Sequence, residues 1–266
     1  MGHACLQALQ HAPALALDNR YTQDAAHQHP EQREPNADGL AQGGTDAMAD
    51  QLNVRIRTFA TVTGIDSEAH ELILGDERLA YSKLVLAWGA EAVSPRIEGD
   101  AEDRIFSIND LEDYAAFRAA ADGKKRVLIM GAGLIGCEFA NDMTVGGFEC
   151  EVVAPCDHVF PTLLPQDAAN AVQRGLEGIG VKFHLGPLVT RVSRDGDGVS
   201  AALSNGVEVK ADVVVSAIGL RPRLDLAVKA GIQVNQGIVA DRLLQTSAKD
   251  VYTLGDCAEV EGRVLL

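Results

Sequence analysis

Continuous apolar runs closed by a glycine or a proline recur through the chain. They fall at 83–90, 127–130, 149–154, 212–219 and 251–254. Runs of this length without polar alternation are typical of strands that are buried on both faces of a parallel sheet. Apolar residues at helical spacing predict helices at 45–52, 111–121, 166–179 and 224–230. Buried strands that alternate with helices predict an α/β fold.

Two other stretches have the shorter, alternating pattern of antiparallel sheet. The segments at 54–59, 61–65, 71–74 and 78–81, with turn residues between them, predict a ribbon. Further on, 188–193, 199–203 and 207–209 predict a three-stranded meander. Its turns are Gly196-Asp197-Gly198 and Asn205-Gly206, the second of which strongly favours a hairpin. The α/β alternation is therefore interrupted by a β-meander.

The run at 127–130 leads into Gly131-x-Gly133-x-x-Gly136, and the residues after it are predicted to be helical. In this context each glycine has its own role. Gly131 permits the tight turn, Gly133 lets a pyrophosphate approach the backbone, and Gly136 allows the helix to pack closely on the strand. The helix N-terminus adds free N–H groups and a positive dipole end. The pattern predicts a dinucleotide site.

Residues 1–36 differ from the rest of the chain. They contain four of the seven histidines and no lysine, and Gly2 is their only glycine. We expect this segment to be poorly ordered or helical in patches, with 6–17 as the expected helical patch. His27 and His29 lack Cys, Asp or Glu partners at ligand spacing, so no metal site is predicted.

Composition narrows the class of partner. The net charge of −15 argues against nucleic acid or an anionic membrane surface. No apolar run approaches the roughly 20 residues of a membrane span, and the N-terminus does not look like a signal peptide. Five cysteines with no C-x-x-C pair indicate neither a zinc site nor a redox disulfide. These features favour the cytoplasm.

The second strand of the predicted dinucleotide unit lacks the usual acidic residue at its end. Ala154 takes that position, and Asp157 is the nearest carboxylate. Asp157 is either a ligand of the adenosine ribose or a solvated loop residue. No lysine or arginine lies between Ala154 and Pro165 to pair with a 2′-phosphate, which favours NADH over NADPH.

Two more carboxylates are candidates for contact with a cofactor. Glu138 lies in the first turns of the helix that begins at the glycine turn. It either interacts with the positive helix end or accepts a hydrogen bond from the nicotinamide carboxamide. Asp256 follows Gly255 at the end of a buried strand, where it is either a turn residue or an acceptor for sugar-like hydroxyls.

Several motifs together resemble a known family. In chain order they are Tyr81-Ser82-Lys83-Leu84-Val85-Leu86-Ala87-Trp88-Gly89-Ala90, the Gly131 turn, Ser216-Ala217-Ile218-Gly219-Leu220-Arg221-Pro222 and Tyr252-Thr253-Leu254-Gly255-Asp256-Cys257-Ala258. This series resembles the two-dinucleotide flavoproteins, in which one Rossmann-type domain binds FAD and an inserted one binds NAD(P)H. The narrower spellings Ala87-Trp88-Gly89-Ala90-Glu91 and Gly136-Cys137-Glu138-Phe139-Ala140 are similar to those of the rubredoxin–NAD reductase group. The resemblance runs from about residue 37 to the end.

The resemblance implies an NADH-dependent flavoprotein reductase that passes electrons from NADH through FAD to rubredoxin or a similar one-electron carrier. It implies that Glu138 is the residue closest to the chemistry, at the nicotinamide end. The other candidate cofactor-binding residues are Ala87, Trp88, Gly89, Gly131, Ala132, Gly133, Leu134, Ile135, Gly136, Asp157, Ile218, Gly219, Gly255 and Asp256. The broader family has threonine where Trp88 stands.

The chain departs from the family at both ends. Residues 1–36 contain no glycine fingerprint for the ADP half of FAD, and no domain follows Gly255-Asp256 to close over a flavin. We therefore expect an internal fragment whose residues 1–36 are unassigned and either disordered or mistranslated. The expected division is a partial FAD-binding domain at 37–108, an NAD-binding domain at 109–232 and a return segment of the FAD-binding domain at 233–266. The alternatives are a stand-alone NAD-binding module without redox activity, or a related reductase that serves ferredoxin, oxygen or nitrite.

Overall fold

The computed structural model describes residues 5–7, 15–17 and 44–264, and it confirms the α/β class. The chain divides into two compact units. The first unit comprises residues 1–91, 110–112 and 220–266, and the second comprises 92–109 and 113–219. In the described parts of the chain, no helix has both the length and the apolar character needed to cross a bilayer.

A five-stranded parallel sheet forms the centre of the second unit. Its strands follow the order β10-β17-β11-β12-β13. Their bounds are β10 Ile105–Phe106, β11 Arg126–Met130, β12 Glu149–Ala154, β13 Lys182–Leu185 and β17 Val213–Ser216. The predicted apolar runs at 127–130, 149–154 and 212–219 all lie in this sheet, as expected for strands buried on both faces.

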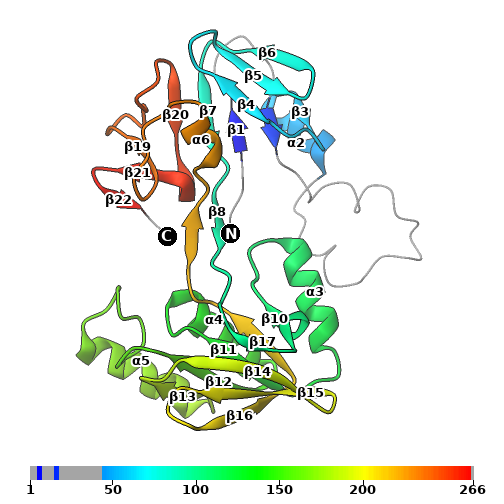
Figure 1. Ribbon diagram of the computed structural model, residues 1–266, viewed down its shortest axis with the longest axis vertical. Coiled ribbons are helices and arrows are strands. Elements are labelled where there is room, and N and C mark those ends of the chain that lie inside the picture. The colour runs from blue at the N-terminus through cyan, green and yellow to red at the C-terminus, as the bar shows by residue number, and fades with distance from the viewer. Residues whose placement is uncertain (1–4, 8–14, 18–43, 265–266) are drawn as a thin grey trace. The chain divides into compact units, whose positions relative to one another are not determined.

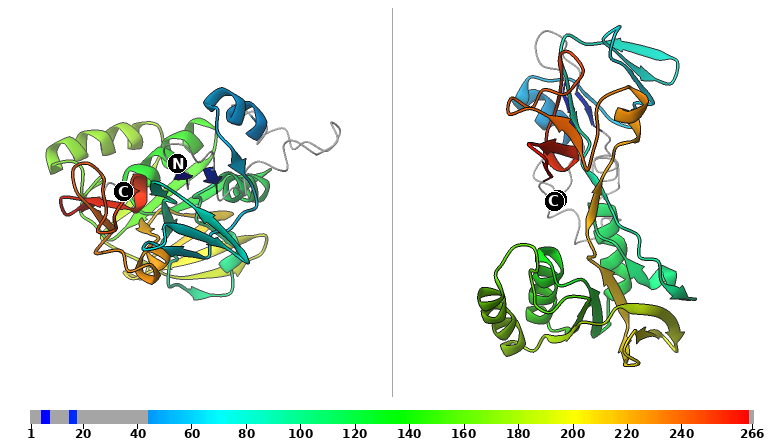
Figure 2. Two further views of the ribbon diagram at one scale, coloured as in Figure 1. Left: turned by 90° about the horizontal axis from the view of Figure 1, so that it is seen from above. Right: turned by 60° about the vertical axis from the view of Figure 1, so that its left-hand side comes forward.

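The two faces of this sheet are covered by different layers (Figures 1 and 2). Helices α3 (Leu111–Ala121), α4 (Leu134–Val145) and α5 (Gln166–Gly178) cover one face. They form one core cluster with alternate strand residues such as Ile129, Val152 and Val215. The intervening strand residues, such as Leu128 and Val214, pack instead against the meander. Successive strand side chains point to opposite faces, so one apolar run supplies both cores.

The meander is as predicted, and it has one additional strand. Strands β14 (Val189–Asp195), β15 (Gly198–Leu203) and β16 (Glu208–Ala211) are antiparallel neighbours, and β9 (Glu98–Gly99) pairs in parallel with β14. Gly99 lies opposite Val192, whose carbonyl oxygen would be 1.9 Å from an added Cβ. Only glycine fits this close approach, which the apolar pattern could not reveal.

The first unit is built on a sheet with the strand order β20-β7-β1-β2-β3. Strand β7 (Leu84–Ala87) is entirely buried and runs parallel to β20 (Val251–Thr253). The predicted ribbon is also present, as antiparallel β4 (Gly64–Asp66), β5 (Glu71–Leu74) and β6 (Glu77–Ala80). The remaining elements are α2 Thr45–Leu52, α6 Asp225–Lys229, β3 Ile56–Arg57, β8 Ala90–Ala92, β18 Leu220–Pro222, β19 Ile238–Ala240, β21 Ala258–Val260, β22 Arg263–Val264, and the 3-10 helices η1 Glu102–Arg104 (in the second unit) and η2 Gly255–Cys257.

The expectation of a helical patch at 6–17 is wrong where it can be tested. Residues Cys5–Gln7 form strand β1 and Leu15–Leu17 form strand β2. Strand β1 pairs antiparallel with β7 and with β2, which in turn lies parallel to β3. The open backbone edge of a buried strand favours any extended segment that can supply hydrogen bonds, and this outweighs weak helical spacing. The rest of 1–36 lies outside the described residues.

One predicted strand of the first unit is much shorter than its pattern suggested. Of the stretch 54–59, only Ile56–Arg57 is strand. Phe59 has a φ of 53°, a conformation that interrupts extended backbone. Phe59 is also 56% exposed, so the apolar residue that suggested a longer strand does not enter the core.

Candidate dinucleotide sites

The turn between β11 and α4 has the geometry that its glycines predicted. Gly131 has a φ of 108°, and an added Cβ would lie 2.3 Å from the carbonyl oxygen of Ala217. At Gly136 an added Cβ would lie 2.0 Å from the carbonyl oxygen of Gly131. Both glycines are therefore required by the packing of the turn itself.

Gly133 differs from the other two glycines of the turn. It is the N-cap of α4, its φ of −77° suits any residue, and an added Cβ would meet nothing within 4 Å. Folding therefore does not require glycine here. The open space adjoins the free N–H groups of a helix N-terminus, which is where a phosphate binds. Of the three glycines, Gly133 carries the strongest indication of a ligand.

Exposed apolar side chains surround this turn at the carboxyl edge of the parallel sheet. Leu134, Ile135 and Ile218 are 48%, 45% and 42% exposed. Gly219, with a φ of 118°, follows Ile218 just beyond the end of β17. Ala132 is buried and accepts a hydrogen bond from the N–H of Phe160 at 2.8 Å. Ligands of open α/β sheets bind at this edge, and apolar walls suit the flat rings of a dinucleotide.

Two predicted carboxylates lie at the surface of the second unit. Glu138 is exposed in the second turn of α4. Ala154 is buried at the end of β12, so Asp157 lies beyond the strand, in the following loop. Its carboxylate is 78% exposed and approaches the Nδ1 atom of His158. Both carboxylates are accessible to a ligand.

The first unit brings together two motifs that are far apart in sequence. Strands β7 and β20 run parallel, so the Ala87–Gly89 turn and Gly255-Asp256 leave the same edge of the sheet. The N–H of Leu254 donates to the carbonyl of Leu86 at 3.0 Å. Gly89 and Gly255 have φ values of 71° and 72°, and Asp256 is half-buried in η2. The two predicted flavin-facing motifs are thus neighbours.

Three residues near these edges were not among the predicted site residues. The buried hydroxyl of Ser216 at the end of β17 has no hydrogen-bond partner among the described residues. The backbone carbonyl of Arg223 accepts a hydrogen bond from the indole N–H of Trp88, and the sulfur of Cys257 lies within hydrogen-bond reach of the Leu86 carbonyl. Only Ser216 had a signal in the sequence, as a polar residue at the end of an apolar run.

The basic stretch at 124–126 lies at the opposite edge of the parallel sheet, where β11 begins. Lys124 pairs with Asp197, and Arg126 pairs with Asp212 at 2.6 Å. These two cations are therefore engaged by carboxylates of their own unit. Their charges are therefore less available to an acidic partner protein.

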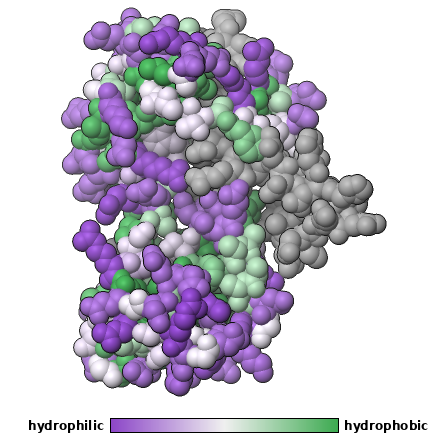
Figure 3. All heavy atoms as spheres, turned by 45° about the vertical axis from the view of Figure 1, so that its right-hand side comes forward, coloured by the Kyte–Doolittle hydropathy of each residue, from purple (hydrophilic) through white to green (hydrophobic). Residues whose placement is uncertain are grey.

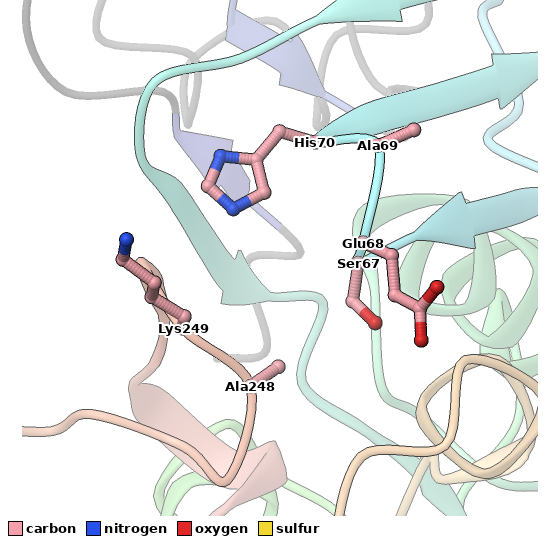
Figure 4. A pocket seen from close by; sticks show the side chains of 6 residues that line it. All are labelled: Ser67, Glu68, Ala69, His70, Ala248 and Lys249. Atoms are coloured by element: carbon pink, nitrogen blue, oxygen red, sulfur yellow. The ribbon is translucent and has the colours of Figure 1, made fainter.

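The first unit has an open hollow that none of the predicted site residues lines (Figure 4). Ser67, Glu68 and His70 of the β4–β5 turn line one side of it, and Ala248 and Lys249 line the other. Within the described ranges, no group of three or more His, Cys, Asp or Glu side chains is placed to hold a metal ion. His27 and His29 lie outside those ranges.

The fold and these edges define a class. The features of a Rossmann-type nucleotide-binding protein are present in both units. The second unit has five parallel strands and a glycine turn that opens into a helix, and the first unit has parallel strands of which one leads into Gly255-Asp256. The chain belongs to the pyridine nucleotide-disulphide oxidoreductase family, whose model matches residues 7–265. The family resemblance drawn from the motifs is therefore confirmed.

Within this family, the chain is similar to proteins of a narrower group. The chain is 52% identical over 230 residues to a rubredoxin-NAD(+) reductase of Alcanivorax borkumensis, covering 86% of this chain and 60% of the relative. It is 44% identical to a rubredoxin-NAD(+) reductase of Acinetobacter baylyi, covering 84% and 59%. The crystal structure of a ferredoxin reductase from Rhodopseudomonas palustris superposes with a TM-score of 0.81 at 25% identity, covering 93% of this chain and 62% of that one. The chain thus spans about three fifths of the length of these proteins.

Proposed function

We propose that the chain serves an NADH-dependent flavoprotein reductase that passes electrons from NADH through FAD to rubredoxin or a similar one-electron carrier. The observation that carries this proposal is the 52% identity to a relative named as a rubredoxin-NAD(+) reductase. Its support in the structure is the pair of sheet edges, one in each unit, at which the predicted cofactor residues gather.

The second unit is assigned to NADH. The pyrophosphate would lie over the space beside Gly133, against the N-terminus of α4. Leu134, Ile135 and Ile218 would flank the dinucleotide, and Glu138 would accept a hydrogen bond from the carboxamide at the nicotinamide end. Asp157 would accept hydrogen bonds from the adenosine ribose, a role that suits NADH better than NADPH.

The first unit is assigned to FAD. The half-buried carboxylate of Asp256 suits hydroxyl groups of a ribityl chain, and the Ala87–Gly89 turn beside it offers close backbone approach. When bound, FAD takes up a two-electron hydride equivalent and releases electrons singly. The residues before β7 hold no second glycine fingerprint for its ADP half. The residues at this edge therefore suit the flavin ring and the ribityl chain of FAD. Because the ADP half has no fingerprint to hold it, we expect the chain's affinity for FAD to be low.

The four cysteines with described positions, Cys137, Cys150, Cys156 and Cys257, are free thiols. With no vicinal pair in the sequence to relay electrons, transfer from the flavin would go directly to the partner protein. Free thiols are also the expected state in a reducing compartment, and we place the reaction in the cytoplasm.

One specific observation favours a second candidate, a NAD-binding module without redox activity. The second unit has its complete glycine turn, whereas the sequence before β7 lacks one for FAD. Within the reductase class, a ferredoxin, oxygen or nitrite reductase is a further alternative, since one structural neighbour is named as a ferredoxin reductase.

The proposal is tested by supplying the chain with FAD and NADH and following the reduction of oxidised rubredoxin at its visible absorbance. We expect rubredoxin to be bleached with NADH, more slowly with NADPH, and not at all without FAD. Transfer to ferredoxin but not to rubredoxin would favour the related reductase. NADH binding without electron transfer to any acceptor would favour the binding module.

A further inference from the structure

The turn at 87–89 is attached on one side to the segment that follows β18. The indole Nε1–H of Trp88 donates to the carbonyl oxygen of Arg223 at 2.8 Å, and the N–H of Arg223 donates to the carbonyl of Gly89 at 3.3 Å. The Trp88 ring is half-buried and packs against the core of the first unit. Its polar atom is thus used within the protein.

On the other side, Cys257 connects the same turn to η2. This side chain is fully buried, and its Sγ lies 3.6 Å from the carbonyl oxygen of Leu86 and 3.4 Å from that of Leu254. The hydroxyl of Thr253, which is also fully buried, lies 3.5 Å from the sulfur. The thiol therefore contacts both β7, at Leu86 near its end, and β20, at its last residue Thr253.

The chemistry of the sulfur suits a fixed contact better than a reactive one. Burial raises the pKa of the Cys257 thiol, although the Thr253 hydroxyl and the backbone N–H groups of Gly89 and Trp88 oppose this rise. The group is therefore neutral at physiological pH, and it can donate its weak S–H hydrogen bond to a carbonyl while accepting one from an N–H or O–H.

We propose that Cys257 is a positioning residue for the flavin edge, because its thiol joins the η2 helix that carries Asp256 to the Trp88–Gly89 turn. Asp256 immediately precedes Cys257, so the contact of Cys257 with β7 fixes where the Asp256 carboxylate leaves the sheet. The inference rests on the proposed function in one respect only, that FAD is the molecule held at this edge.

The test uses Trp88, the only tryptophan of the chain, as a reporter located in the turn itself. Three variants of the full chain are compared: Cys257→Ala, Cys257→Ser and the control Cys150→Ala. Cys150 is 1% exposed and lies in β12 of the second unit, so it measures the general cost of losing a buried thiol. For each variant, Trp88 emission, acrylamide quenching, and the dissociation constants for FAD and NADH are measured.

We expect Cys257→Ala to shift Trp88 emission to the red, to increase its quenching and to weaken FAD binding about ten-fold, while NADH binding stays unchanged. Cys257→Ser keeps a donor and an acceptor and should restore most of the loss, and Cys150→Ala should change neither Trp88 nor FAD binding. Trp88 emission and FAD affinity that match the wild type in Cys257→Ala would overturn the inference.

The same measurements distinguish a failure of the proposed function from a failure of the inference about Cys257. A wild-type chain that does not bind FAD even at high concentration would count against the flavin assignment. The emission of Trp88 in Cys257→Ala would still decide the structural half of the inference, because that measurement needs no flavin. An unchanged emission would overturn the link between the two turns, whatever the affinity for FAD.

Discussion

The three glycines of the β11–α4 turn show how single residues separate folding from binding. Gly131 and Gly136 are fixed by backbone oxygens 2.3 Å and 2.0 Å from the position of a Cβ. Gly133 has open space at the same point and an ordinary φ. A sequence pattern treats the three positions alike, whereas the structure shows that packing requires glycine at two of them and leaves open space at the third, where we propose that a ligand approaches.

Replacing Gly133 by alanine should therefore weaken NADH binding without unfolding the unit. We expect a loss of at least about ten-fold in NADH affinity, because the methyl group occupies space that the pyrophosphate needs. The cost in unfolding free energy should be about 1 kcal/mol or less, since alanine caps a helix less well than glycine. NADH fluorescence titration and urea unfolding of the same samples measure the two effects.

Gly131→Ala and Gly175→Ala are the matched controls for that variant. Gly131→Ala should destabilise the second unit by about 2 kcal/mol or more, because the added methyl collides with Ala217 and the φ is positive. Gly175 lies within α5 with nothing within 4 Å of an added Cβ, so alanine there should leave NADH binding unchanged. NADH affinity in Gly133→Ala equal to that of the wild type would remove the main reason to place the pyrophosphate at this turn.

Asp157 should govern the choice between NADH and NADPH. Asp157→Arg would exchange an acceptor for ribose hydroxyls for a cation that can pair with a 2′-phosphate. A charge-assisted hydrogen bond of about 1.5–3 kcal/mol would raise the NADPH-to-NADH affinity ratio roughly ten-fold or more. The control Asp167→Arg, on the exposed first turn of α5, makes the same charge change away from the predicted ribose site. Equal ratios in the two variants would place the ribose elsewhere.

For single residues, the sequence was enough to find those with distinctive chemistry but not the residues that they contact. Glycine spacing and the Gly255-Asp256 pair could be recognised directly, because few residue types fit such turns. The hydrogen bond from Trp88 to Arg223 joins residues 135 positions apart, and the contact of Cys257 with Leu86 joins residues 171 apart. Such contacts depend on the register of the sheet, which no local pattern contains.

At the scale of secondary-structure elements, Asp212 links the beginnings of strands β11 and β17. Its carboxylate accepts hydrogen bonds from the N–H groups of Lys125 and Arg126 at 3.0 and 2.8 Å, and it pairs with the Arg126 guanidinium at 2.6 Å. Burial alone would raise the pKa of Asp212, but these donors outweigh it and lower the pKa to about 2. The carboxylate thereby holds the start of β17 to the start of β11.

Asp212 should make the stability of the second unit depend on pH. A carboxyl group whose pKa is lowered in the folded state stabilises above its unfolded pKa and loses this effect as the pH falls through the folded value. Its contribution should be about 2–3 kcal/mol at pH 7, because the pKa falls from its usual value near 3.8 to about 2 and each unit of this shift corresponds to roughly 1.4 kcal/mol. The difference between wild type and Asp212→Asn should be constant above about pH 5 and disappear between roughly pH 4 and 2.

Urea unfolding followed by circular dichroism at several pH values measures this difference. Asp195→Asn is the control, because Asp195 pairs with Lys210 in an exposed position on the meander and should matter little. A difference between wild type and Asp212→Asn that persists unchanged at the lowest pH would mean that the ion pair is not its source.

Helices and strands were predictable where their own sequence carries a clear apolar pattern. Helices 45–52 and 111–121 and strands 71–74 and 149–154 have the bounds that the apolar pattern predicted. Elements that exist only because a neighbour offers an edge were missed. Strands β1 and β2 beside β7, and β9 beside β14, are two or three residues long and carry little pattern of their own.

For the whole molecule, the described surface is mainly hydrophilic on the face shown in Figure 3, with apolar residues in small groups. The two most exposed of the large apolar side chains described, Leu243 at 78% and Val145 at 74%, lie in different units, so neither unit presents both on its own surface.

The net charge of −15 repels acidic partner proteins, so binding of an acidic electron carrier should strengthen as added salt screens that repulsion.

The whole chain combines a second unit that has a complete glycine turn with a first unit that has only the sheet edge proposed to hold the flavin. The central claim is that these two edges hold NADH and FAD. It is tested most directly by the visible absorbance spectrum of the purified chain after incubation with FAD and desalting, and again after anaerobic addition of NADH.

We predict flavin absorbance bands at low FAD occupancy that bleach when NADH is added, because both cofactor edges would be in use. Bands that bleach in the wild type but not in Gly133→Ala at the same NADH concentration would tie the bleaching to the predicted dinucleotide turn. A chain that stays colourless at every FAD concentration, yet still binds NADH, would contradict the account of the first unit.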